Sequence, residues 1–252
     1  AAIRCRADRD GDEFVINGQK IWSTRAVFAD WVFCLLRTDP ESSRHHGLSF
    51  ILVPLDAPGV TVRPIPQLNG LPGFAEIFFD DVRVSDFNLI GEEGGGWAIA
   101  MATAGFERGL MLRSPARFQQ ASRRLVELYR QRQNDILDLS IEDSVVRCYM
   151  DAEAYALSTY QTASRLINNG AIGPESSCNK IFWSELDLRI HETAMSLLGA
   201  KAEIEPSSPD ADQQLANWLD GFLFAQSGPI YAGTNEIQRN IIAERMLGMP
   251  RR

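Results

Sequence analysis

Two segments of this 252-residue chain carry side chains that could take part in chemistry. Glu107 is followed directly by Arg108, and Thr234 and Glu236 open a segment with an apolar stripe at helical spacing. A carboxylate works as a base near neutral pH when burial in a dry pocket raises its pKa. A threonine that caps a helix marks a helix N-terminus, which favours polar or anionic groups. The plain alternatives are a solvated acid on a helix surface at Glu107 and a simple helix cap at Thr234.

The cysteines and histidines are scattered and lack the spacing of metal ligands. They are Cys5, Cys34, Cys148, Cys178, His45, His46 and His191. The two adjacent histidines lie in a polar stretch that is typical of a loop tip. We therefore expect reduced, structural thiols and no metal.

Composition limits the classes of function. Apolar residues make up 45% of the chain, enough for a sizeable core, and the formal net charge of -8 disfavours binding to a phosphate backbone. No apolar run approaches the roughly 20 residues that cross a bilayer. We expect a globular protein with no nucleic-acid partner and no membrane insertion, located in the cytoplasm or, as the alternative, in the mitochondrial matrix.

Residues 1–92 are expected to form a β domain. Asn17 and Gly18 stand between two alternating segments, and this pair suits the positive φ values of a two-residue hairpin turn. Branched and aromatic residues, separated by Gly, Pro, Asp and Ser, predict further strands at 31–36, 48–53, 60–63 and 75–84. Strands at this spacing predict a small barrel or sandwich.

Residues 93–252 have a helical pattern. After three glycines at 94–96, apolar residues recur at helical intervals and predict helices at 97–113, 116–132, 141–168, 177–198, 213–227 and 234–247. Such helices predict an antiparallel bundle of the four-helix type. The expected fold class is therefore multidomain α and β, with a small β-barrel or sandwich domain followed by a C-terminal helical bundle.

Three segments spread over nearly the whole chain share one family pattern. They are 17–24 (NGQKIWST), 79–97 and 231–239 (YAGTNEIQR). In this order they resemble segments of acyl-CoA dehydrogenases, although Ser85 stands where the second segment usually has proline. Residues 1–7 resemble the stretch that comes directly after a Gly-Ser-Asp motif in that family. The resemblance implies the family's middle and C-terminal domains, with its N-terminal helical domain absent from this chain and the piece inactive by itself.

The resemblance also implies an FAD cofactor and its contacts. Trp22 would cover the flavin, with ordinary core packing as the alternative, and Thr24 would bond the isoalloxazine edge. Thr234 and Glu236 match residues that contact the flavin nucleotide. Glu236 usually corresponds to glutamine, and a carboxylate near the diphosphate would repel it.

In this family a glutamate removes the α-proton of an acyl-CoA thioester while the β-hydrogen leaves as hydride to flavin N5, giving a 2,3-enoyl-CoA. Ala232 stands where many members have that glutamate, and a methyl group cannot accept a proton. The family's second position for the base, just ahead of an arginine on the first C-terminal helix, falls on Glu107. Arg108 would hold this base or touch the acyl-CoA, with packing as the alternative, and Tyr231 is a further candidate for substrate contact.

Two motifs that hold flavin across a subunit interface in the family are missing. No Phe-Gly pair follows the arginines in 130–132, and 196–201 keep one glycine of a Gly-Gly pair. These losses suit a hetero-oligomer in which a partner completes some flavin sites, as among dehydrogenases of bulky or steroid-derived acyl-CoA; a homo-oligomer is the alternative. An electron-transfer partner protein is implied as well. A catalytically silent subunit of the same fold, retained for assembly, is the alternative to an enzyme.

Overall fold

The computed structural model describes residues 3–110, 113–132, 140–169, 173–203 and 213–251. Within these ranges the side chains of 104–110, 169, 203 and 213–216 are not described. The chain divides into two compact units, Ala1–Phe106 and Glu107–Arg252. Each unit has its own hydrophobic core.

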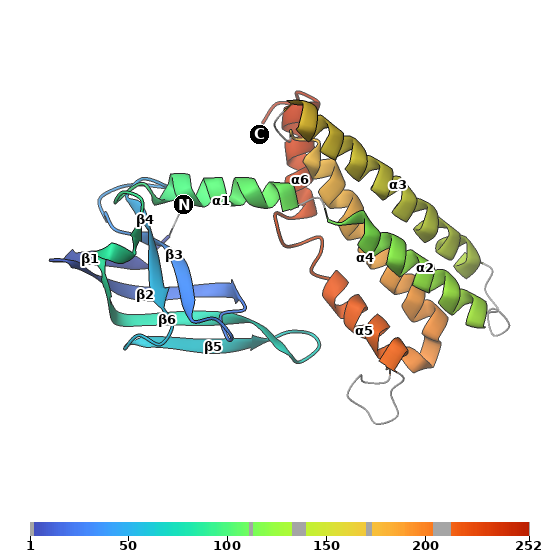
Figure 1. Cartoon of the computed structure of the whole chain (residues 1–252), viewed down its shortest axis with the longest axis horizontal. Coiled ribbons are helices and arrows are strands. Elements are labelled where there is room, and N and C mark those ends of the chain that lie inside the picture. Colours follow the sequence, from blue (N-terminus) through green and yellow to red (C-terminus); the bar gives the residue numbers. More distant parts are fainter. Residues whose placement is uncertain (1–2, 111–112, 133–139, 170–172, 204–212, 252) are drawn as a thin grey trace. The chain divides into compact units, whose positions relative to one another are not determined.

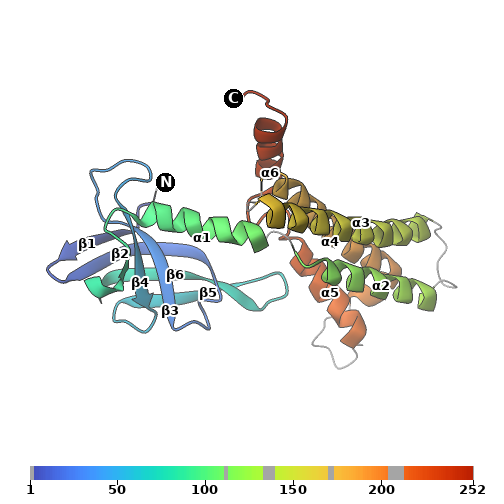
Figure 2. The same cartoon turned by 45° about the horizontal axis from the view of Figure 1, so that its top comes forward.

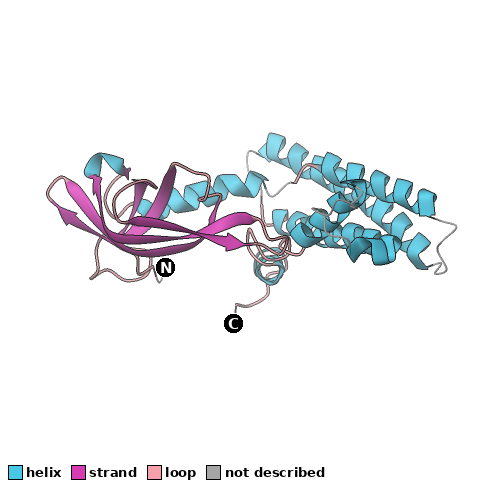
Figure 3. Cartoon of the chain, turned by 90° about the horizontal axis from the view of Figure 1, so that it is seen from below, coloured by secondary structure: helices cyan, strands magenta, loops and turns pink. Residues whose placement is uncertain are grey.

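The first unit is built on one seven-stranded sheet, whose strands are magenta in Figure 3. They are β1 (Arg6–Asp10), β2 (Glu13–Thr24), β3 (Trp31–Arg37), β4 (Leu48–Pro54), β5 (Val60–Pro66), β6 (Pro72–Ser85) and β7 (Leu89–Ile90), with the short helix η1 (Asp86–Asn88) before β7. The strand order is β5-β6-β2-β1-β3-β4-β7, and every neighbouring pair is antiparallel except β1 and β3. Because β5 and β7 are edge strands, the sheet is open and does not close into a barrel.

Alternating apolar residues fix the register of β2. Phe14 and Ile16 are fully buried while the residues between and beside them are partly exposed, and Ile77 on the neighbouring β6 joins the same core. Successive strand residues point to opposite faces of a sheet. Full burial of such a side chain contributes about 1.5 to 3 kcal/mol. A slip by one residue would expose this set, so the core determines where Trp22 and Thr24 lie at the end of β2.

The predicted hairpin turn at Asn17 and Gly18 is wrong. β2 continues through this pair with a register shift against β6, and Gly18 has φ 127°. A Cβ at Gly18 would lie 2.9 Å from Cα of Cys5, so glycine is needed there. Nδ2 of Asn17 donates to Oδ1 of Asp81 at 2.9 Å, and the Asp81 amide donates back to Oδ1 of Asn17 at 3.0 Å. The pair therefore forms a bulge inside a long strand, and the chain turns instead at Gly11, between β1 and β2.

The helices follow the glycine-rich segment. They are α1 (Gly96–Leu110), α2 (Pro115–Arg132), α3 (Ser140–Asn169), α4 (Ser176–Leu198), α5 (Gln213–Ala225) and α6 (Asn235–Ile241), with the 3-10 helix η3 (Gly199–Glu203) after α4 and the π-helical turn η4 (Ile242–Met246) after α6. In the second unit α2, α3 and α4 lie side by side and α5 lies beside α4, with successive helices running in opposite directions (Figure 1, Figure 2). The predicted antiparallel bundle is confirmed. The domain boundary between residues 92 and 93 stays a prediction, because α1 spans the junction of the two units.

Large aromatic side chains form the centre of the bundle. Phe118 on α2, Tyr155 on α3 and Trp183 on α4 are almost fully buried, and the rings of Phe118 and Tyr155 meet edge to face with their centroids 5.1 Å apart. The Tyr155 hydroxyl donates to the carbonyl oxygen of Arg113 at 2.8 Å, because a buried phenol needs a hydrogen-bond partner. This core holds α4 in place, and side chains from α4 reach the loop before α6.

Within the described part of the chain, no helix is long and apolar enough to cross a membrane. Among the same residues, no group of three or more His, Cys, Asp or Glu could hold a metal ion. The four cysteines are free, and burial raises the pKa of the Cys34 thiol to about 12. A thiol with so high a pKa stays protonated, so Cys34 packs as a small apolar side chain.

Candidate functional site

The candidate base belongs to α1. The backbone of Glu107 and Arg108 lies in this helix near its C-terminal end. Their side chains lie outside the described residues. The structure therefore places Glu107 on a helix, and the direction of its carboxylate stays a prediction.

Trp22 is held in an unusual backbone conformation near the end of β2. Its φ is 61°, and the register of β2 against β6 shifts between Lys20 and Ser23. The left-handed region is costly for a bulky residue, and such residues cluster at functional sites. The bulge turns the indole outward, where it is 62% exposed and meets Phe74 edge to face with the centroids 5.9 Å apart. Trp22 therefore lies outside the hydrophobic core of the first unit.

Thr24 follows two residues later and is also exposed. It pairs with Phe74 in the ladder between β2 and β6. Its hydroxyl makes no hydrogen bond to another residue that the structure describes. The end of β2 therefore presents a flat aromatic surface and a hydroxyl group that is available to a ligand.

The loop that precedes α6 has a fixed shape. Ala232 and Gly233 both have positive φ, 55° and 83°. Nε2 of the buried Gln238 donates to the carbonyl oxygen of each, at 3.3 and 3.2 Å. The Asn235 amide donates to the carbonyl oxygen of Pro229 at 2.9 Å and closes the loop. The methyl group of Ala232 is therefore carried on a well-defined backbone.

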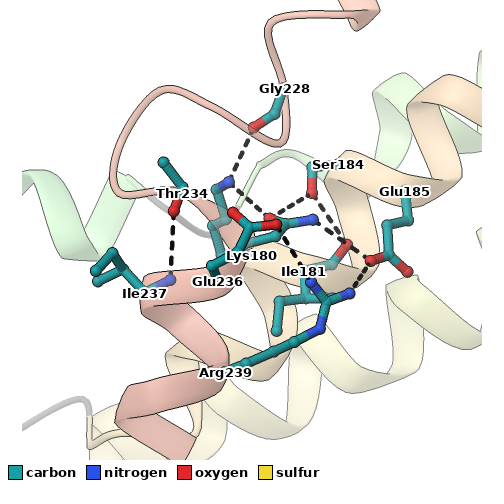
Figure 4. A network of polar contacts seen from close by, with 10 residues as sticks. Lys180, Ile181, Ser184, Glu185, Gly228, Thr234, Glu236, Ile237 and Arg239 are labelled. Atoms are coloured by element: carbon teal, nitrogen blue, oxygen red, sulfur yellow. Dashed lines mark hydrogen bonds and ion pairs between the residues drawn. The ribbon is translucent and has the colours of Figure 1, made fainter.

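Thr234 caps α6. Its Oγ1 accepts from the Ile237 amide at 3.3 Å (Figure 4). The side chain of Glu236, in the first turn, is 78% exposed, and hydrogen bonds from its own backbone amide and from the Thr234 hydroxyl lower the pKa of its carboxyl. Thr234 is thus the N-cap of α6, as one of the two interpretations of the sequence proposed. The Glu236 carboxylate faces outward.

Tyr231 is held by a residue that the sequence reasoning missed. Its hydroxyl accepts a hydrogen bond from Nη2 of Arg113, and the Arg113 guanidinium lies over the rings of Trp183 and Tyr231, 5.1 and 5.5 Å from their centroids. Burial raises the pKa of Tyr231. The phenol therefore remains protonated at neutral pH and is tied to the core of the bundle.

A buried lysine lies under the same loop (Figure 4). Nζ of Lys180 on α4 donates to the carbonyl oxygen of Gly228 at 2.9 Å and to Oδ1 of Asn235 at 2.8 Å. The Ser184 hydroxyl donates to the same Oδ1 at 3.1 Å. Burial lowers the pKa of Lys180 to about 8, while the carboxylates of Glu236 and Glu185 act in the opposite direction. These contacts join α4, the loop and the start of α6.

A signal for Lys180 exists in the sequence, but it is easily misread. Lys180, Ser184, Asp187 and His191 recur at helical spacing, and such a polar stripe normally predicts the solvated face of a helix. In the structure all four lie at 8% exposure or less. The same spacing therefore marks a buried polar stripe of α4, and the sequence pattern does not distinguish the two.

Solved structures define the class of fold. The chain matches a chain of the "Tcur3481-Tcur3483 steroid ACAD" structure with a TM-score of 0.89 and 30% identity, covering 100% of this chain and 65% of that one. It matches a chain of the ChsE4-ChsE5 complex from Mycobacterium tuberculosis with a TM-score of 0.85 and 31% identity, with the same coverage of 100% and 65%. A β-sheet unit followed by a helical bundle is thus part of a larger, known architecture.

Family models identify both parts. The model of the acyl-CoA dehydrogenase middle domain matches residues 1–82, and that of the acyl-CoA dehydrogenase C-terminal domain matches residues 94–247. The chain belongs to the acyl-CoA dehydrogenase family. It is 39% identical over 261 residues to acyl-CoA dehydrogenase IpdE1 of Mycobacterium tuberculosis, covering 100% of this chain and 63% of the relative. It is 40% identical over 243 residues to IpdE1 of Mycolicibacterium smegmatis, covering 94% and 58%. The chain therefore spans about three fifths of the length of these relatives.

Proposed function

We propose that this chain provides the middle and C-terminal domains of an FAD-dependent acyl-CoA dehydrogenase in which Glu107 is the base. Glu107 would remove the α-proton of the acyl-CoA, and FAD, when bound, would supply the acceptor for the hydride that leaves the β-carbon, so that the product would be a 2,3-enoyl-CoA. The observation that carries the proposal is the loop at 231–234, which keeps a fixed backbone although Ala232 brings no carboxylate to it. A loop with a fixed backbone but no carboxylate at position 232 supports a base at the family's other position for it, which falls on Glu107.

The residues at the end of β2 fit the ring system of FAD. Trp22 offers an exposed aromatic face and Thr24 a hydroxyl without a described partner. When bound, FAD would supply the hydride acceptor, while the protein supplies orientation. Thr234 and Glu236 are assigned to the nucleotide part, where an exposed carboxylate can accept hydrogen bonds from sugar hydroxyls. A contact of Glu236 with the diphosphate itself would be repulsive.

The base and the thioester need different surroundings. A carboxylate at Glu107 needs a dry environment, so that its pKa rises towards neutrality. The developing enolate needs hydrogen-bond donors at the thioester oxygen. Arg108 is assigned to holding Glu107 or contacting the acyl-CoA. Tyr231, which Arg113 fixes in place, is assigned to the acyl side of the loop.

The proposed substrate class is a bulky, steroid-derived acyl-CoA. Its support is the match to a structure named as a steroid ACAD. The names of that structure and of the ChsE4-ChsE5 complex each contain two components. We therefore include a second dehydrogenase-like subunit as partner, which would complete the flavin contacts that the missing Phe-Gly and Gly-Gly motifs no longer supply. An electron-transfer protein would reoxidise the flavin.

A second candidate is a catalytically silent subunit that is retained for assembly. The observation that favours it is Ala232, since the loop position that carries the base in many relatives cannot accept a proton. Under this alternative Glu107 would be a surface acid. Dehydrogenation by the assembled protein would then be independent of Glu107.

One substitution separates the two candidates. Glu107→Gln in the protein expressed from its complete reading frame, together with its partner subunit, is expected to lower kcat/KM by about 100-fold to 10,000-fold, as for loss of a general base. Glu192→Gln removes an exposed carboxylate from α4 and is the matched control. Unchanged turnover in the Glu107→Gln protein would eliminate Glu107 as the base and favour the silent subunit.

A further inference from the structure

The side chain of Lys180 is a buried ammonium group that forms no ion pair with the residues described in the structure. Lys180 is fully buried, whereas Lys20 is partly exposed and Lys201 is exposed. Burial of a charged group is costly unless partners replace its water. Among the residues that the structure describes, no carboxylate lies within ion-pair distance of Nζ of Lys180; its hydrogen bonds go to a backbone carbonyl and a side-chain amide. Such an arrangement needs a reason other than charge pairing.

The two acceptors of Lys180 lie at the two ends of one loop. Gly228 begins the segment that leads to Ala232, and Asn235 begins α6 behind it. One amine therefore ties the entry and the exit of this loop to α4 (Figure 4). Since Ala232 has a positive φ that an alanine rarely adopts, the loop needs such ties to keep its shape.

Further hydrogen bonds hold Asn235, at the end of the loop. Oδ1 of Asn235 accepts hydrogen bonds from Nζ of Lys180 and from the Ser184 hydroxyl, and Nδ2 of Asn235 donates to Oε1 of Glu185 at 3.4 Å. Glu185 in turn accepts from Arg239 on α6 at 2.6 Å. At the exposed middle, the carbonyl oxygens of the loop are held from below by Gln238. The network therefore acts on the backbone and leaves the outer surface of the loop open.

We propose that Lys180 is a positioning residue: it sets the backbone geometry of the loop at 231–234 from beneath, without touching the cofactor or the substrate. This inference rests on the proposed function, under which that loop contacts both the flavin and the acyl-CoA. Lys180→Met keeps the length and the apolar stem of the side chain but cannot donate. The Gly228 carbonyl oxygen then loses its partner in the interior, and the loop relaxes.

The test combines hydrogen exchange with flavin titration of the protein from the complete reading frame. The Lys180→Met protein is expected to exchange the Asn235 and Gln238 amides at least about tenfold faster relative to the amides of α3, and to bind FAD at least about tenfold more weakly, equal to about 1.4 kcal/mol. Arg189→Met, which removes a cation of α4 that pairs with Asp151, is the control and should leave both quantities unchanged.

A purely structural role predicts a different pattern. If Lys180 only stabilised the bundle, the amides of α3 and of the loop would accelerate together, and that result would overturn the proposal. A loosened loop with unchanged FAD affinity would also overturn it. Lys180→Gln, which retains amide donors on a shorter stem, should recover part of both effects.

A second variant and the wild-type protein serve as further tests of the proposal. If the methionine variant does not fold, Ser184→Ala removes a weaker tie to Asn235 and should shift the exchange of the Asn235 amide in the same direction by a smaller factor; no shift there counts against the proposal. A wild-type protein that binds no FAD would defeat the proposed function. The exchange experiment would then still decide on its own whether Lys180 shapes the loop.

Discussion

The side-chain amide of Gln238 binds the carbonyl oxygen of Ala232 at 3.3 Å. This contact fixes the backbone at position 232, where many acyl-CoA dehydrogenases carry a glutamate. Ala232 already has φ 55°, so the cost of a Cβ in the left-handed region is present in this protein. A longer side chain at the same position would add no new backbone strain. The backbone conformation at position 232 is therefore compatible with a glutamate.

This geometry predicts that the base can be moved back to the loop. Ala232→Glu in the Glu107→Gln background is expected to raise kcat/KM at least about tenfold above that of Glu107→Gln alone, because a positioned carboxylate contributes about 100-fold to 10,000-fold as general base. Steady-state kinetics with an acyl-CoA substrate would measure it. Ala232→Gln in the same background is the isosteric control without a basic group. Equal rates for the glutamate and glutamine variants would show that the loop does not face the α-carbon.

The strained backbone at Trp22 predicts an unusual stability effect. Glycine relieves the positive φ of Trp22 but forfeits its contact with Phe74. At Trp31, also exposed and in a strand, glycine brings no such relief and only loses strand preference. Trp22→Gly should therefore destabilise the protein less than Trp31→Gly, by about 1 kcal/mol.

The comparison is made by chemical denaturation in the absence of flavin, so that ligand binding does not contribute. Flavin titration of the same Trp22→Gly protein is expected to show weaker binding, because the aromatic face is lost. A Trp22→Gly protein that is the less stable of the two would mean that the backbone at this bulge is not strained.

Much of the fold could be predicted because turn-forming residues clearly separate the strands and helices in the sequence. Strands 31–36, 48–53 and 75–84 appear within a few residues of their predicted bounds, since Gly, Pro and Asp separate alternating apolar segments. The prediction of a hairpin turn at Asn17 and Gly18 failed because the positive φ that suits such a turn also suits a bulge. Only the tertiary contact between Asn17 and Asp81 decides between the two.

The site was predictable only as far as its motifs reach. Trp22, Thr24 and Thr234 were predicted from motif residues; the structure exposes Trp22 and Thr24 at the end of β2, and their contacts with a flavin stay predictions. Arg113 and Lys180 were missed because they act from beneath the loop, through contacts 118 and 48 residues apart in the chain. Short motifs record residues that face a ligand, whereas supporting residues depend on the packing of distant helices.

The contact of Arg113 with Tyr231 predicts a cost for removing one hydroxyl. Tyr231→Phe deprives a partly buried guanidinium of its acceptor, which is expected to lower the free energy of unfolding by about 1 to 3 kcal/mol. Tyr160→Phe, at a phenol that is 60% exposed on α3, should change it by less than about 0.5 kcal/mol. Denaturant unfolding measures both. Equal stability of the two variants would show that the hydroxyl contact contributes nothing.

The buried ammonium of Lys180 predicts a dependence of stability on pH. Its pKa is about 8 in the folded protein against a reference of 10.5, while Glu185 on α4 and Glu236 and Arg239 on α6 are the charged groups around it. Between these two values the unfolded chain keeps a proton that the folded protein has released. This group therefore adds stability as the pH rises from about 8, and it adds nothing further above 10.5. Below pH 8 its burial carries a constant cost.

The matching measurement compares wild type with Lys180→Met, because all other titrating groups are shared and cancel. The difference in unfolding free energy should shift in favour of the wild type by on the order of 2 kcal/mol between about pH 7 and about pH 9.5. Arg189→Met, whose cation pairs with Asp151 at the surface, should give no such shift in this range. A difference that stays constant with pH would mean that Lys180 remains charged in the folded protein up to its ordinary pKa, and that the carbonyl oxygen of Gly228 and Oδ1 of Asn235 replace its hydration in full.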